Sequence, residues 1–165
     1  MSPRAACRLE SLGFAQVYDY VTGLTDWTAN GLPTVGPLAD IPAARDAVRR
    51  DETPTCLLTE RLGDVRERVE AAGQNACIVT SEGGIVLGRL RRDAWDAGSE
   101  ALVESVMESG PTTVRPDELL EGLTERMRSR GVGSILVTTS TGKLIGVLYR
   151  KDAEETLHRG SGHAL

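Results

Sequence analysis

The feature that most constrains this chain is an internal repeat. The segment that begins at Arg61, "RLGDVRERVEAAGQNACIVTSEGGIVLGRLRRDA", aligns with the segment that begins at Glu118, "ELLEGLTERMRSRGVGSILVTTSTGKLIGVLYRKDA". Gly73 then falls on Gly131, 58 positions later, and the hairpin glycines that follow keep this offset. Upstream, "PTCL" matches "PTTV" with an offset of 57. Two copies of one structural unit are therefore expected within the chain.

Each copy predicts the same elements in the same order. A short apolar strand comes first, and apolar residues then recur at helical spacing. These residues are Leu62, Val65, Val69 and Ala72 in the first copy and Leu119, Leu120, Leu123 and Met127 in the second. A glycine follows each helix, at a position where a left-handed residue commonly ends one.

A β-hairpin and a second helix complete each copy. "ACIVT" and "IVLGRL" form the first hairpin around the turn "SEGG", and "SILVTT" and "KLIGVL" form the second around "STG". The helix after the first hairpin is expected from about Asp93 through "SEALVESVMES", and the helix after the second from about Asp152 to His158.

The predicted fold is α+β, with layers of the α/β type. Each copy is a β-α-β-β-α unit, and its three strands are too few to bury both faces of a sheet. Two copies packed face to face, with pseudo-two-fold symmetry, solve this problem. The expected boundaries are residues 53–108 for the first copy and 109–159 for the second, with a disordered tail at 160–165. The junction between two similar surfaces is a cleft in which ligands commonly bind.

Composition excludes several classes of protein. The net charge of −5 argues against a general nucleic-acid binder, which needs a basic face. No apolar run approaches the length of a membrane helix and no secretion signal is evident, so a soluble cytoplasmic protein is expected. Cys56 and Cys77 lie in apolar runs and are expected to be buried, and His158 and His163 lack partner ligands for a metal.

Three segments carry a resemblance to a known family. The stretch "VMESGPTTVRPDELL", the paired hairpins "GGIVLGRL" and "TGKLIGVL", and the strand ending "GVLYRKD" resemble a tandem pair of CBS domains (cystathionine-β-synthase motifs), often called a Bateman module. The resemblance covers roughly Thr53 to His158. It implies AMP, ADP, ATP or S-adenosylmethionine as a regulatory ligand between the copies, no required cofactor, and a homodimer formed through the helices.

The ligand motif of that family falls on the end of the second copy. The motif is glycine, two apolar residues, Ser or Thr, two variable residues and Asp, and it matches Gly146 to Asp152 with Tyr149 at the Ser or Thr position. The resemblance makes Asp152 the candidate that accepts hydrogen bonds from the ribose hydroxyls. It also places Thr112 and Thr113 on the first strand beside the ligand, with Thr55 at the corresponding place in the first copy.

The first copy departs from the motif. "GRLRRD" is one residue short, so Asp93 falls at a different step from its glycine, and Arg91 takes the Ser or Thr position. A carboxylate holds a vicinal diol well, and the cations beside it can offset phosphate charge. These cations are Arg150 and Lys151 in the second copy and Arg91 and Arg92 in the first. The alternative is that these cations only solvate the start of a helix.

The first third of the chain has another pattern. Residues 2–35 predict a helix that begins near Ser2 and Pro3, a strand in "QVYDYV" and a short helix in "LTDWTANGLP". This order resembles the closing segment of a rhodanese domain, assigned to residues 1–36. Cys7 lies in the first helix rather than in an anion-binding loop, so sulfurtransferase activity is not expected. Residues 37–52 are expected to form a linker with one short helix, Ala43 to Arg50.

Three functions follow from these patterns. The first is a regulatory sensor, without enzymatic activity, that binds an adenosine-containing ligand between the copies. The second is a dimerisation scaffold in which the pair no longer binds a ligand and the amino-terminal segment contacts a protein partner. The third, a rhodanese-like sulfurtransferase remnant, lacks the upstream part that carries catalysis in that family.

Overall fold

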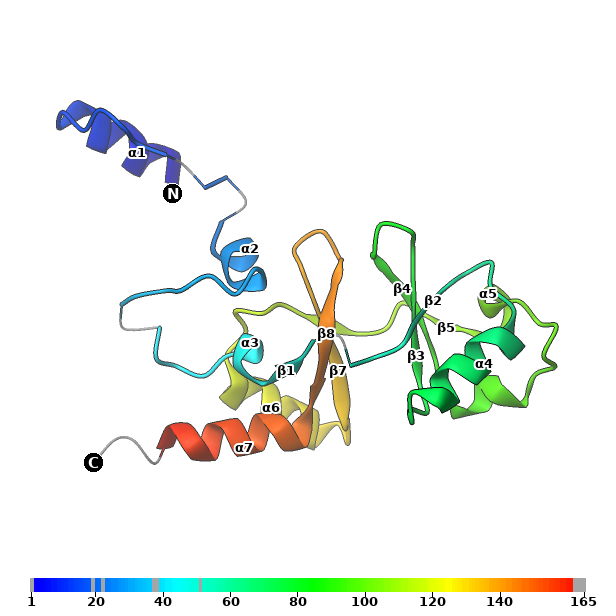
Figure 1. Ribbon diagram of the computed structural model, residues 1–165. Helices are drawn as coiled ribbons and strands as arrows, with labels where there is room; N and C mark the ends of the chain where they lie inside the picture. The colour runs from blue at the N-terminus through cyan, green and yellow to red at the C-terminus, as the bar shows by residue number, and fades with distance from the viewer. Residues whose placement is uncertain (1, 19, 22, 37–38, 51, 162–165) are drawn as a thin grey trace.

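The computed structural model describes residues 2–18, 20–21, 23–36, 39–50 and 52–161. Most of the chain forms two lobes that lie side by side, each built on one four-stranded sheet (Figure 1). We call the sheet β2-β3-β4-β5 with its helices the first lobe, and the sheet β1-β8-β7-β6 with its helices the second lobe. Within the described residues, no helix is both long enough and apolar enough to cross a bilayer.

The first lobe contains most of the first copy of the repeat. Its elements are β2 (Thr55–Leu57), α4 (Leu62–Ala71), β3 (Cys77–Thr80), β4 (Val86–Leu90), the 3-10 helix η1 (Arg92–Asp96), α5 (Val103–Val106) and β5 (Glu108–Ser109). β2 and β3 are parallel, and the other pairs are antiparallel. The apolar face of α4 packs against the sheet, where Cys56 and Cys77 are buried as expected.

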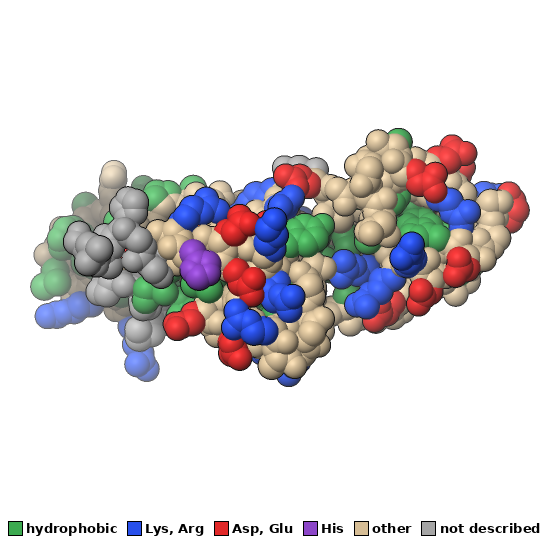
Figure 2. Space-filling model, turned by 90° about the horizontal axis from the view of Figure 1, so that it is seen from below, with side chains coloured by type: hydrophobic (Ala, Val, Ile, Leu, Met, Phe, Trp, Pro, Cys, Tyr) green, Lys and Arg blue, Asp and Glu red, His purple; other side chains and the backbone are tan. Residues whose placement is uncertain are grey.

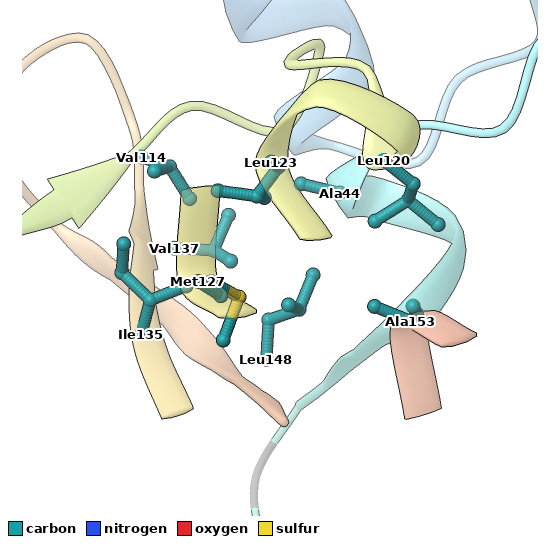
Figure 3. Close-up of a cluster of buried hydrophobic side chains, with 10 residues drawn as sticks. Ala44, Val114, Leu120, Leu123, Met127, Ile135, Val137, Leu148 and Ala153 are labelled. Atoms are coloured by element: carbon teal, nitrogen blue, oxygen red, sulfur yellow. The ribbon is translucent and has the colours of Figure 1, made fainter. Parts of the chain in front are cut away.

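The second lobe repeats this arrangement. Its elements are α3 (Ala44–Ala47), β1 (Val48–Arg49), β6 (Thr113–Val114), α6 (Leu120–Ser129), β7 (Ser134–Thr138), β8 (Leu144–Tyr149) and α7 (Arg150–Ser161). Side chains from α3, α6, α7 and the sheet meet in one apolar cluster, in which Leu120, Leu123 and Leu148 are fully buried (Figure 3). The glycines after α4 and α6, Gly73 and Gly131, both have φ of 65°, which explains the helix ends.

A pseudo-two-fold relation joins the lobes at the hairpin tips. The amide of Val86 donates to the carbonyl of Gly142 over 3.0 Å, and the amide of Leu144 donates to the carbonyl of Gly84 over 2.9 Å. The two donors are 58 positions apart in the sequence, and so are the two acceptors. Ile78, Leu136 and Val147 form a buried cluster of their own from both sheets. The repeat read from the sequence is therefore also a spatial repeat.

Residues 39–50 are part of the second lobe, where the sequence predicted a linker. The expected helix Ala43 to Arg50 ends at Ala47, because Val48 and Arg49 pair with β8 as an edge strand. Close contact is needed for this pairing, since a Cβ on Gly146 would lie 2.1 Å from the carbonyl oxygen of Arg49. The corresponding edge strand of the first lobe is β5, which pairs with β4.

Two other expected elements differ from the structure. The helix expected after the first hairpin is broken into η1 and α5, and a loop with a turn from Gly98 to Ala101 separates them. In the amino-terminal segment, α1 (Ser2–Ser11) and α2 (Gly23–Ala29) form, but "QVYDYV" is not a strand in its described residues. Tyr18 and Val21 are 87% and 89% exposed there, without a sheet edge to pair with.

The amino-terminal segment contacts the second lobe through α2. The hydroxyl of Thr25 donates to Asp117 over 3.2 Å, and Arg50 donates to the carbonyl of Ala29 over 3.0 Å. Cys7 lies in α1 and is exposed. At the other end, α7 extends to Ser161, and His163 falls outside the described residues.

Candidate ligand site

A cavity of about 450 Å³ lies where the two lobes meet. The second lobe contributes β6, β7 and α6, and the first lobe contributes the ends of β4 and β5. Its apolar wall comes from the second lobe: Val114, Leu123, Met127, Val132, Ile135 and Leu136. Its charged residues are Arg89, Arg91, Arg126, Arg130, Glu108 and Glu118. We call this space the arginine cavity, because four cations face two carboxylates in it.

Arg89 is the cation most deeply placed in the arginine cavity. It extends from β4 across the junction, and its Nη2 donates to the hydroxyl of Ser134 on β7 over 3.1 Å. Its Nε is buried and has no hydrogen-bond partner. Burial, and then the neighbouring Arg91, lower the pKa of the Arg89 guanidinium below its ordinary value. Among the described residues, no carboxylate lies within ion-pair distance of Arg89, so this half-buried cation has no direct ion pair, and the nearby Glu108 only partly offsets the lowering of its pKa.

The other cations of the cavity are more exposed. Arg91 contacts Glu108, with 2.7 Å between Nε and Oε2, and Arg126 contacts Glu118. No ion pair of Arg130 is found within the described part of the chain. Figure 2 shows Lys and Arg side chains gathered at the junction of the lobes on the face seen from below. The arrangement therefore offers an apolar wall and an excess of positive charge, which suits an anionic ligand with a flat apolar part.

Part of the predicted site lines the arginine cavity. Thr112, just before β6, and Thr113, its first residue, line the cavity, as does Arg91. Arg92 and Asp93 belong to η1, are exposed and do not line the cavity. Thr55, the counterpart of Thr112, lines a separate cavity of about 390 Å³ with Thr53, Thr80, Gly84, Leu144, Ile145 and Gly146.

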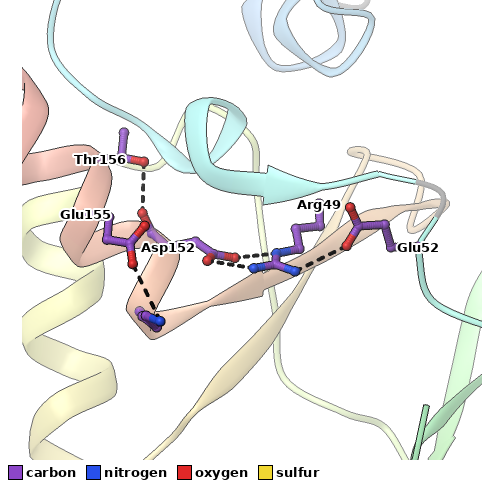
Figure 4. A network of polar contacts seen from close by, with 6 residues as sticks. Arg49, Glu52, Asp152, Glu155 and Thr156 are labelled. Carbon is purple, nitrogen blue, oxygen red and sulfur yellow. Dashed lines mark hydrogen bonds and ion pairs between the residues drawn. The ribbon is translucent and has the colours of Figure 1, made fainter. Parts of the chain in front are cut away.

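Asp152 lies elsewhere, and both of its oxygens are bound by the chain itself. Arg49 on β1 donates from Nε to Oδ2 over 2.6 Å and from Nη2 to Oδ1 over 2.9 Å (Figure 4). The same guanidinium lies over the Tyr149 ring, 5.2 Å from its centroid, and contacts Glu52 at 3.3 Å. Hydrogen bonds from Arg49 hold the pKa of the Asp152 carboxyl below its ordinary value. We call this pairing of Arg49 with Asp152 the clamp.

The sequence grouped residues that the fold separates. It placed Asp152 with Thr112 and Thr113, but the threonines line the arginine cavity and Asp152 lies in the clamp. Arg150 and Lys151 lie one turn from Glu154 and Glu155 on α7, at 4.0 and 3.8 Å. These two contacts fit the alternative in which the cations solvate a helix start.

Sequence reasoning missed Arg89, Glu108, Ser134, Arg126, Arg130 and Arg49. Arg89 carried a signal, because it is the one charge inside the apolar run "IVLGRL". Glu108 and Arg49 lie on two-residue edge strands, which leave no periodic pattern. Among the described residues, no three His, Cys, Asp or Glu side chains lie close enough together to hold a metal ion.

Comparison with known proteins supports one fold. Residues 103–159 match the family model described as CBS domain. A sequence search of curated proteins finds no match.

Solved structures with the same arrangement include three with bound ligands. The cytosolic domain of the Mg²⁺ channel MgtE in complex with ATP has a TM-score of 0.64 and 19% identity, over 72% of this chain and 51% of that one. CBSX2 in complex with AMP has a TM-score of 0.63 and 15% identity, over 72% and 97%. The CBS domain pair of MJ0100 in complex with 5'-methylthioadenosine and S-adenosyl-L-methionine has a TM-score of 0.60 and 14% identity, over 72% and 98%. The chain thus spans about half the length of the MgtE structure and nearly all of the other two.

Proposed function

We propose that this chain, which contains a CBS domain at residues 103–159 and has the fold of a CBS-domain pair, is a regulatory protein that binds an adenine nucleotide in the arginine cavity. The observation that carries the proposal is Arg89, a half-buried guanidinium whose buried Nε has no hydrogen-bond partner and which forms no direct ion pair among the described residues. Burying a cation costs free energy unless an anion compensates it. A nucleotide phosphate would supply that anion, and the apolar wall would pack against the base.

The charge of the cavity favours some adenosine ligands over others. Four arginines and two glutamates leave an excess of positive charge, so AMP, ADP and ATP should bind better than S-adenosylmethionine, whose sulfonium is itself a cation. Structures of the same fold hold both kinds of ligand. The distribution of charge in this chain supports the phosphorylated kind.

The regulatory step would be a change in how the lobes are oriented. The cavity takes residues from both lobes, so a ligand there contacts both and favours the arrangement that fits it best. Its effect cannot exceed the difference in its affinity for the two arrangements. We propose that the protein has no enzymatic activity, that it forms a homodimer through its helices, and that a protein partner detects the change.

Thermal unfolding with AMP, ADP, ATP, adenosine and S-adenosylmethionine tests the proposal. The phosphorylated ligands should raise the midpoint, since a ligand at 100 times its Kd stabilises the folded state by about 2.7 kcal/mol. Adenosine and S-adenosylmethionine should have smaller effects. No shift with any of the five would contradict nucleotide binding.

The second candidate is a scaffold that binds no nucleotide. The clamp favours it, because Arg49 already binds both oxygens of the carboxylate that the family motif provides for ribose. On this view the paired lobes serve assembly alone. The unfolding experiment distinguishes the regulator from the scaffold, because the unfolding midpoint of a scaffold should not change when a nucleotide is added.

A further inference from the structure

We infer that Glu108 binds the ribose hydroxyls in the arginine cavity and selects ribonucleotides over deoxyribonucleotides. The inference rests on the nucleotide binding proposed above and goes beyond it, because it concerns a residue outside the family motif. The ribose of a nucleotide determines which side chain can bind it. A vicinal diol has two donors, and an ionised carboxylate accepts from both with hydrogen bonds stronger than those of neutral acceptors.

Two carboxylates line the arginine cavity, and an arginine contacts one oxygen of each, so the two differ in exposure rather than in occupancy. Arg126 on α6 binds Glu118 at Oε1, and the Glu118 side chain is 32% exposed. Glu108 is 54% exposed, and Arg91 contacts its Oε2. Each carboxylate has one oxygen for which no contact is found among the described residues, and that of Glu108 belongs to the more exposed side chain, so Glu108 is the more accessible acceptor for a ligand.

Strand pairing places Glu108 directly opposite Arg89. Glu108 on β5 is the register partner of Arg89 on β4, so both belong to one rim of the cavity. The strands approach closely there, since a Cβ on Gly88 would lie 3.0 Å from the Glu108 carbonyl oxygen. A ligand with its phosphate on Arg89 therefore has a carboxylate within the same rim for its sugar.

The other carboxylates considered for this role are not in the cavity. Asp93 is exposed on η1 and does not line it, and Asp152 is held in the clamp. The second lobe also carries the opposite charge at the place of Glu108. Arg49 pairs in register with Val147, as Glu108 pairs with Arg89, 58 positions earlier. An acceptor for a diol therefore stands on the edge strand of one lobe only.

The test compares ADP with 2'-deoxy-ADP in calorimetric titrations of the full chain, its Glu108→Gln and Glu118→Gln variants, and an Asp93→Asn control on exposed η1. A lost hydrogen bond to a charged group corresponds to about a tenfold change in affinity. The unmodified chain should bind ADP about tenfold more tightly than 2'-deoxy-ADP. Glu108→Gln should reduce that ratio to about one to two, because an amide accepts through one oxygen only. Glu118→Gln should keep the ratio, and Asp93→Asn, outside the cavity, should keep both affinities.

The ratio of the affinities for ADP and 2'-deoxy-ADP tests the role of Glu108 separately from nucleotide binding itself. Removing a negative charge changes phosphate binding for both nucleotides alike, so the ratio reports the sugar alone. Equal affinity of the unmodified chain for the two nucleotides, or a full ratio in Glu108→Gln, would overturn the role of Glu108 and leave nucleotide binding intact. If the unmodified chain binds neither nucleotide, the proposed function is overturned, and the inference with it.

Discussion

The two lobes share one fold but use equivalent positions for opposite purposes. In the first lobe, the edge strand brings Glu108 to Arg91 at the rim of the arginine cavity. In the second, the edge strand brings Arg49 to Asp152 in the clamp, outside the cavities described here. The two edge-strand residues have opposite charge, although their partners are not equivalent, because the residue 58 positions before Asp152 is Ala94. The repeat thus determines where an edge-strand side chain lies. The charge of that side chain determines whether it lines the cavity or forms an ion pair within the chain.

Substitutions that disturb the two edge strands should have the largest effects, and they test whether the two edges differ in stability. Gly146→Ala places a Cβ 2.1 Å from a backbone oxygen of Arg49, whereas Gly88→Ala meets mainly the flexible end of Met107, at 2.5 Å. Overpacking of this kind typically costs 1–3 kcal/mol, so we expect a loss of about 3 kcal/mol for Gly146→Ala and about 1 kcal/mol for Gly88→Ala. Urea unfolding measures both. Equal losses would show that the two edges are held alike.

A substitution of Arg89 tests the part of the first lobe that should bind the ligand. Arg89→Met should weaken ADP binding by about two orders of magnitude, the scale of one lost charged contact with phosphate. The free energy of unfolding without ligand should not fall, because the variant removes a half-buried cation that has an unpaired Nε and no direct ion pair among the described residues. Arg92→Met, on exposed η1, is the matched control and should change neither quantity. A marked loss of stability in Arg89→Met would mean that Ser134 alone satisfies the guanidinium.

Loss of the clamp should have the smallest effect on stability, and this effect should depend on pH. Since Arg49 lowers the pKa of Asp152 in the folded state, the clamp stabilises the protein above the unfolded pKa of about 3.9 and stops doing so as the pH falls through the folded pKa. Asp152→Asn should therefore lower the melting temperature at neutral pH and have no effect in strong acid. Melting curves across this range check the sign.

Ligand binding supplies the control for the clamp. Asp152→Asn should leave the affinity for ADP unchanged, because Asp152 does not line the arginine cavity. A variant that loses ADP binding while remaining folded would return Asp152 to the role that the family motif implies.

Much of the fold could be predicted from the sequence, for physical reasons that are local. Periodic apolar residues, the glycines after α4 and α6, and the hairpin turns each report on a few neighbouring residues, and the repeat confirms them twice. The CBS-pair fold predicted from these patterns is confirmed. The resemblance of residues 1–36 to a rhodanese segment stays a prediction.

The site was harder to predict because its decisive contacts join distant parts of the chain. Arg49 lies 103 positions from Asp152, and Arg89 lies 45 positions from Ser134. A two-residue strand such as β1 has no period that would place Arg49 beside β8. The family motif drew attention to the ends of the central strands, but it could not reveal that Arg49 binds both oxygens of Asp152.

The most direct test of the central claim is a crystal structure of the protein grown with ADP. We expect the nucleotide between β6, β7 and the ends of β4 and β5, with a phosphate on Arg89 and with Arg49 still bound to Asp152. A nucleotide with its ribose on Asp152, and Arg49 displaced from both carboxylate oxygens, would contradict the account.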